Sequence, residues 1–154
     1  VSGNHEYYAG ISDFYLLCQS IGAAILDNSS MLVNDCIYVA GVPDKAAKSF
    51  NYQSVNVSQA LQNVDFQKPV IFLSHQPHIF EEVSKYPVTL QLSGHMHAGQ
   101  IPPFDLIEKI FFKYFYGLYQ KSGSYLYVTS GTRWWGPPMR LFSRSEIVKI
   151  TLHK

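Results

Sequence analysis

The stretch Lys68-Pro-Val-Ile-Phe-Leu-Ser-His-Gln-Pro77 decides the fold, because a continuous apolar run ends there in a small polar cluster. Four consecutive apolar residues, 70–73, fit a strand that is buried on both faces, as the strands of parallel sheets are. A second apolar stretch, 88–92, ends in Ser93-Gly-His-Met-His97. The chain therefore carries histidines at the ends of two successive strands, which is where open α/β sheets build their ligand sites.

Strands and helices alternate on both sides of this centre. The spacing of apolar residues predicts helices over 9–21, 58–64 and 78–85, and further strands over 24–26, 124–130 and 146–152. The runs 31–33 and 37–42 flank Asn34-Asp35 and predict a hairpin. This alternation indicates an α/β fold with a mixed sheet.

The composition excludes several classes of protein. The chain has 154 residues, of which 47% are hydrophobic and 15% charged, so it is long and apolar enough to bury the core of one domain. A formal net charge of +1 without a basic run predicts no nucleic-acid partner. Cys18 and Cys36 are far apart and predict two buried free thiols. No segment reaches the roughly 20 apolar residues of a membrane-spanning helix.

Three polar clusters, at 3–6, 74–75 and 94–97, each follow an apolar strand and together hold four of the six histidines. Imidazole nitrogens and an amide oxygen are competent ligands for zinc, iron or manganese. In His95-x-His97, an extended backbone would point both side chains to the same side. The two imidazoles could then bind one metal ion, or each could serve one of two adjacent ions.

Each cluster by itself has an ordinary structural interpretation. A lone His-x-His is common on loops, Asn4 fits a simple turn, and His75 fits a helix cap or a core position. His78 and His153 are expected at the surface. The metal-site interpretation therefore depends on all three clusters occurring together in this order.

Taken in order, the motifs Gly3-Asn-His-Glu6, Ser74-His-Gln-Pro77 and Gly94-His-Met-His-Ala-Gly-Gln100 resemble the later motifs of the calcineurin-like metallophosphoesterases. The tail 128–141, followed by Ser145-Glu-Ile147, resembles the bacterial branch of that family, which is often membrane-associated. The resemblance covers nearly the whole chain. It implies that residues 1–154 are the C-terminal portion of a single domain with a four-layer α/β/β/α sandwich and mixed sheets.

The resemblance also implies a site for two divalent or trivalent metal ions, Mn, Fe or Zn. Asn4, His75 and His95 would be ligands of the second ion, and His97 a ligand of the first. A metal-bridging hydroxide would attack the phosphate ester, and His5 would assist the leaving group. The implied reaction is hydrolysis of a phosphodiester or of a lipid-linked pyrophosphate.

The family's Asp-x-His and Gly-Asp-x-x-Asp motifs are not in this sequence. Without them the first ion keeps only His97 as a ligand. We therefore expect the chain by itself to be inactive and to bind at most one metal ion weakly. An apolar strand edge left without its neighbour predicts self-association. A targeting segment upstream of Val1 would not be visible, so the expected localisation is membrane-associated or cytoplasmic.

An aromatic segment, 102–119, follows the last histidine motif. One interpretation is an apolar lip that meets a membrane surface or the acyl chains of a lipid substrate, with lysines facing the head groups. The other is that the aromatic side chains form ordinary core over the sheet. Two alternative functions remain open. One is a non-catalytic module that binds a partner or a membrane through this segment, and the other is a module that binds a single metal ion.

The loop at 131–138 contains Arg133 and two tryptophans, and Arg140 and Arg144 follow it. An arginine here could bind a phosphate through two hydrogen bonds. We favour Arg140, in either a structural or a substrate-binding role. Trp134 and Trp135 are expected to pack the loop against the sheet.

Overall fold

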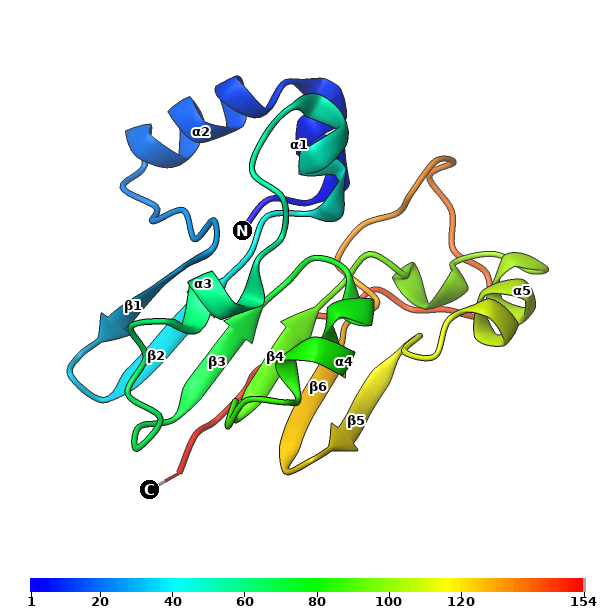
Figure 1. The fold of residues 1–154 in the computed structure, drawn as a ribbon. Coiled ribbons are helices and arrows are strands. Elements are labelled where there is room, and N and C mark those ends of the chain that lie inside the picture. The colour runs from blue at the N-terminus through cyan, green and yellow to red at the C-terminus, as the bar shows by residue number, and fades with distance from the viewer. Residues whose placement is uncertain (154) are drawn as a thin grey trace.

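A six-stranded mixed sheet forms the centre of the computed structural model, which describes residues 1–153 (Figure 1). The strands lie in the order β1-β2-β3-β4-β6-β5. Their bounds are β1 (Ser29–Val33), β2 (Ile37–Gly41), β3 (Val70–Leu73), β4 (Leu90–Ser93), β5 (Gly117–Lys121) and β6 (Ser124–Val128). The predicted α/β class with a mixed sheet is confirmed.

The four central strands β2, β3, β4 and β6 run parallel to one another. The edge strands β1 and β5 pair antiparallel with their neighbours. Because the central strands are parallel, the segments that follow them all leave the sheet at the same edge. Loops starting near residues 42, 74, 94 and 129 therefore meet at one end of the molecule.

One face of the sheet carries helices (Figure 1). These are α3 (Val57–Leu61) and α4 (Phe80–Val83), and buried strand residues such as Phe72 join their side chains in one apolar core. The other helices are α1 (Asn4–Ala9), α2 (Ile11–Ser20) and α5 (Phe104–Phe111), with short 3-10 turns η1 (Lys45–Phe50), η2 (Pro77–Ile79) and η3 (His97–Gly99). Strand residues of the opposite parity, such as Ile71, are only half-buried.

The predicted hairpin and the strands predicted at 70–73, 88–92 and 124–130 are present with ends shifted by up to two residues. The predicted helix 58–64 is shorter, and its cap is Asn56, whose Oδ1 accepts a hydrogen bond from the Gln59 N–H at 3.0 Å. The predicted helix 78–85 is present as η2 followed by α4.

Other local predictions were wrong. The helix predicted over 9–21 is an exception, because it is present as α2 with its ends shifted by up to two residues; Gly10, at φ 119°, separates it from α1, which was not predicted as a helix. Residues 24–26 and 146–152 form no strand. The strand β5 was not predicted, because it begins inside the aromatic segment and has no separate pattern. Cys18 and Cys36 are free as expected, but neither is buried: Cys18 is half-buried and Cys36 is exposed. Across residues 1–153, no helix combines the length and the apolar character needed to span a bilayer.

Candidate metal site and its cavity

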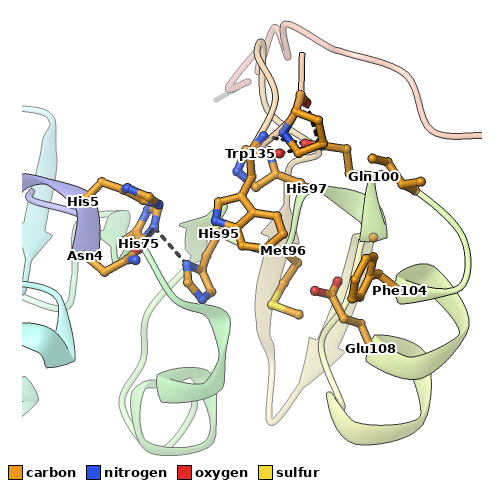
Figure 2. A pocket seen from close by; sticks show the side chains of 13 residues that line it. Asn4, His5, His75, His95, Met96, His97, Gln100, Phe104, Glu108 and Trp135 are labelled. Atoms are coloured by element: carbon orange, nitrogen blue, oxygen red, sulfur yellow. Dashed lines mark hydrogen bonds between the residues drawn. The ribbon is translucent and has the colours of Figure 1, made fainter. Parts of the chain in front are cut away.

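A cavity of about 290 Å³ opens where the loops after β3 and β4 meet α1. Asn4, His5, His75, His95 and His97 all line it. In Figure 2, Asn4, His5, His75 and His95 lie on one side, and Phe104 and Glu108 lie on the other. The three polar clusters that lie far apart in the sequence thus meet at one cavity, while His78 and His153 are exposed elsewhere, as expected.

The N-terminus of α1 places Asn4 beside the loop that follows β3. The Gly3 N–H donates a hydrogen bond of 2.7 Å to Oε2 of Glu6, which fixes the first turn of this helix. A Cβ on Gly3 would lie 3.1 Å from the ring of His75, so a larger residue at this position would require the ring to shift by a few tenths of an ångström. The sequence predicted a turn at this point, whereas the structure has a helix that begins at Asn4.

The side chains of Asn4, His75 and His95 converge. Nε2 of His75 lies 3.0 Å from Oδ1 of Asn4 and 3.2 Å from Nδ1 of His95 (Figure 2). The two imidazole rings meet edge to face, with centroids 5.0 Å apart. Three atoms that can each donate an electron pair therefore lie within one small volume.

The chemistry of this donor set fits a cation. If Nε2 of His75 carries a proton, that one N–H has to be shared between the amide oxygen of Asn4 and the nitrogen of His95. A metal ion satisfies all three lone pairs at once. Within residues 1–153, no group of three His, Cys, Asp or Glu side chains could hold a metal ion, and the third donor atom of this cluster is the amide oxygen of Asn4.

Burial keeps these imidazoles neutral. It lowers the pKa of His75 below its ordinary value of 6.5. Burial, and after it the neighbouring positive charge of a protonated His75, lowers the pKa of His95 to about 4. Burial also lowers the pKa of His97, and the charge of Arg140 lowers it further. At neutral pH the ring lone pairs are therefore available without loss of a proton.

A buried carboxylate, that of Asp44, lies behind the loop that carries His75. The Nε2 group of Gln76 donates to both of its oxygens, at 3.0 and 2.8 Å, and the Ala46 N–H donates to Oδ1 at 2.8 Å. The negative charge of Asp44 acts to raise the pKa of His75 and His95, and so favours positive charge in the cavity. The sequence analysis did not identify Asp44 as part of the site.

His97 lies outside this cluster. Its Nδ1 is 3.3 Å from Nη2 of Arg140. The extended backbone assumed for His95-x-His97 was wrong, although both side chains line the same cavity. His95 and His97 have φ values of 71° and 51°, and Met96 between them is helical. Left-handed backbone at two non-glycine residues is a strained arrangement of the kind found at functional sites.

Arg140 holds the loops of the site together. Its guanidinium donates to the backbone carbonyls of His97 at 3.1 Å and Ser130 at 2.7 Å, and its Nε donates to that of Arg133 at 3.0 Å. These contacts are those of the structural role considered for this residue. A substrate-binding role for Arg140 stays a prediction.

The far end of the cavity is apolar, lined by side chains that include Met96, Phe104 and Trp135. Trp134 and Trp135 are 50% and 54% exposed, so the expectation that they pack against the sheet was wrong. Gln100, which is buried, holds this loop: its Oε1 accepts from the Trp135 N–H at 2.5 Å and its Nε2 donates to the Trp135 carbonyl at 2.6 Å. Sequence reasoning missed this role of Gln100.

Glu108, from α5, also lines the cavity, and sequence reasoning missed it. Its Oε2 is buried and has no hydrogen-bond partner among the described residues. Burial raises the pKa of this carboxyl, and the charge of Asp105 raises it further. Only the orientation of the helix places Glu108 here, so the sequence alone held no signal for it.

Comparison with known proteins finds relatives that are named as metallophosphoesterases. An uncharacterized metallophosphoesterase of Helicobacter pylori strain J99 is 38% identical over 154 residues, which cover 99% of this chain and 41% of that protein. A transmembrane protein with metallophosphoesterase domain from Danio rerio is 37% identical, over 98% of this chain and 37% of that protein. An uncharacterized metallophosphoesterase of Aquifex aeolicus is 36% identical, over 99% and 59%.

The chain thus spans between 37% and 59% of the length of these three relatives. No family model matches the chain. No solved structure matches it either. The similarity nevertheless covers nearly every residue of this chain, including all three histidine-bearing clusters.

Proposed function

Because this chain is similar over nearly its whole length to proteins named as metallophosphoesterases, we propose that it supplies one part of a two-metal site of the calcineurin-like kind for phosphate-ester hydrolysis. Asn4, His75 and His95 would hold one metal ion, and His97 would contribute to the site of the other. Manganese, iron and zinc all suit a donor set of imidazoles and one amide oxygen. We propose the hydrolytic activity for a longer protein of this kind, because this chain spans only 37% to 59% of the length of the three relatives.

One observation carries the proposal. Oδ1 of Asn4, Nε2 of His75 and Nδ1 of His95 form a chain of contacts of 3.0 and 3.2 Å at one end of a cavity. Where the amide oxygen and the two neutral imidazoles meet, there are more lone pairs than N–H groups to pair with them. This is the arrangement of a metal site rather than of a hydrogen-bonded core.

When bound, the metal ions would activate water and neutralise charge on the phosphoryl oxygens. The residues of this chain would do the rest. His5, which is exposed at the edge of the cavity, would give a proton to the leaving oxygen of the ester. Arg140 would keep the backbone around His97 in position through its contacts to the two neighbouring loops.

The substrate would be a phosphodiester or a lipid-linked pyrophosphate. The support for this class is that a single cavity joins the histidine cluster to an apolar wall that includes Ile101, Phe104 and Trp135. A phosphate group bound at the histidines would leave its organic substituent against that wall. An apolar substituent would lose less solvation there than a charged one.

A metal titration tests the proposal. We expect the chain to bind one Mn²⁺ per molecule by calorimetry or equilibrium dialysis, and His75→Ala to weaken this binding at least about tenfold, since a ligand is lost. His78→Ala is the matched control, because His78 is exposed and lies outside the cavity. Absence of binding by the unaltered chain, or equal binding by both variants, would refute the proposed site.

A turnover assay tests the expectation that this chain is inactive alone. With bis(p-nitrophenyl) phosphate and added Mn²⁺, we expect no hydrolysis above the rate without protein, because the carboxylate ligands of the first metal are not in the sequence. Turnover that disappears in His75→Ala would contradict this expectation while supporting the site.

A second candidate function is binding of a single metal ion without catalysis. The observation in its favour is that the donor cluster has three members, while His97 is engaged with Arg140. A longer protein of this family, carrying the Asp-x-His and Gly-Asp-x-x-Asp motifs, distinguishes the two functions. It should bind two ions and hydrolyse the ester if the first proposal holds, and one ion without turnover if the second does.

A further inference from the structure

The helix α5 exposes its apolar face to solvent and turns its acidic residues toward the protein, the reverse of an ordinary surface helix. Its two acidic residues, Asp105 and Glu108, are its least exposed members, one turn apart on the face turned toward the protein. Its apolar residues Leu106, Ile110 and Phe111 are 60%, 79% and 76% exposed. A helix that is in contact only with water and its own protein buries its apolar face instead.

A backbone contact fixes this orientation. At Gly99, a Cβ would lie 2.2 Å from Cα of Asp105, so the start of α5 rests directly on the backbone of the histidine loop. The orientation leaves Oδ1 of Asp105 and Oε2 of Glu108 buried without a hydrogen-bond partner among the described residues. Burying two carboxyl oxygens in this way is unfavourable, and exposure of the apolar face adds to the cost. A contact on the exposed face would offset both.

A second exposed apolar segment lies next to α5. In the loop 131–142, Trp134, Met139 and Phe142 are 50%, 57% and 89% exposed. This loop is attached to the start of the α5 region, because the Leu141 N–H donates to the carbonyl of Gln100 at 2.9 Å. Residues of α5 and residues 141–144 also line one groove. We call α5 and the loop 131–142 together the aromatic surface.

The charge of the aromatic surface is positive. Within α5 and the loop 131–142 the sequence has two acidic residues, the two that α5 turns inward, and three basic ones, Lys109, Arg133 and Arg140. Lys109 and Arg133 are exposed, and each lies over an aromatic ring, at 5.5 and 6.0 Å from the ring centroid.

We propose that the aromatic surface docks on an anionic lipid bilayer. The side chains of Ile110, Phe111 and the tryptophans would enter the interfacial region, where tryptophan is favoured, while Lys109 and Arg133 would meet lipid phosphates. A second copy of the chain fits less well, because face-to-face pairing would bring the cations of both copies together. The aromatic surface adjoins the cavity of the proposed metal site, since Phe104 and Trp135 belong to both. Docking on a bilayer needs no bound metal ion, so the inference goes beyond the proposed function.

The two tryptophans serve as an intrinsic fluorescence probe of the aromatic surface, because both lie in its loop and the chain has no others. We expect their fluorescence to shift to shorter wavelength on mixing the chain with vesicles of equal parts phosphatidylglycerol and phosphatidylcholine. Lipids with brominated acyl chains should quench it. Vesicles of phosphatidylcholine alone should bind more weakly, because the electrostatic attraction is absent.

The double variant I110S/F111S should bind these vesicles at least about tenfold more weakly, since two large apolar side chains are lost from the contact. The matched control is L16S/L17S on α2, where the two leucines are 64% and 58% exposed at a different part of the fold (Figure 1). It should bind as the unaltered chain does. Circular dichroism verifies that both variants fold.

Three results would overturn the proposal. The first is equal binding by the two variants, or none by the unaltered chain. The second is vesicle binding without quenching by brominated lipid, which would place the contact on another surface. The third is a dimer, seen by light scattering, that I110S/F111S dissociates, since a second copy would then be the occupant.

Discussion

At one end of the cavity polar side chains are packed inside the protein, and at the other end apolar side chains face solvent. At the histidine end, Asn4 is only 8% exposed. At the α5 end, Ile110 and Phe111 are among the most exposed residues of the chain. Polarity alone therefore does not determine which residues are buried here. Close contacts at two glycines also contribute: Gly3 packs against the ring of His75 at one end, and Gly99 against the backbone of Asp105 at the other.

The largest expected effect is the difference in the free energy of unfolding between two phenylalanine substitutions, one in the core and one on α5. Phe72 is fully buried under the helices, whereas Phe111 is 76% exposed. Phe72→Ala should lower the free energy of unfolding by about 3–5 kcal/mol, because it leaves a cavity in the core. Phe111→Ala should change it by no more than about 0.5 kcal/mol. Urea unfolding followed by circular dichroism measures both, and a large loss in Phe111→Ala would mean that α5 belongs to the core.

The junction between the two ends is tested by glycine substitution. Gly99 has φ 71°, and an added Cβ would collide with the backbone of Asp105. Gly99→Ala should therefore cost about 3 kcal/mol of stability, from left-handed strain together with displacement of α5. It should also alter the tryptophan fluorescence, because α5 and the loop with the tryptophans meet at Gln100.

Gly123→Ala is the matched control. Gly123 also has positive φ, 85°, but an added Cβ would meet nothing within 4 Å. This variant should lose only the roughly 1–2 kcal/mol of left-handed backbone strain. An equal loss of unfolding free energy in the two variants would show that the contact between Gly99 and α5 does not contribute to stability.

The sequence was sufficient to predict the parts of the fold that depend on local pattern. The buried run at 70–73 and the hairpin over β1 and β2 were readable because hydrophobic period and turn chemistry agree there. The strand predicted over 146–152 failed because an alternating pattern does not show whether a partner strand is available. The helix α1 was also missed, since the polar residues at its start fit a simple turn equally well.

The candidate site was predictable in its members but not in its geometry. The order of the three motifs identified Asn4, His75 and His95 as neighbours. The turn of the backbone at His95 and His97 could not be predicted, because it needs left-handed φ values that non-glycine residues rarely adopt. Gln100 and Glu108 take their positions from contacts that form only after the loops and α5 meet.

The smallest expected effect concerns pH and the histidine end. The pKa of His95 is about 4 in the folded chain and about 6.5 when unfolded. Between these values the unfolded chain binds more protons, so stability is complete above pH 6.5 and is lost as the pH falls toward 4. From pH 7 to pH 5, His95 should account for a loss of about 1 kcal/mol, a value reduced from the full linkage energy because the ring is partly exposed to solvent.

Urea unfolding at pH 7 and pH 5, in a chelator to remove metal ions, measures this loss, and His95→Gln isolates it. Glutamine does not titrate, so the loss between the two pH values should shrink by about 1 kcal/mol in the variant. Other groups, such as Glu108, whose raised pKa acts in the opposite direction, contribute equally to both proteins and cancel in the difference. An identical pH dependence in the two proteins would mean that His95 is hydrated, and the histidine end would then resemble the solvent-facing α5 end.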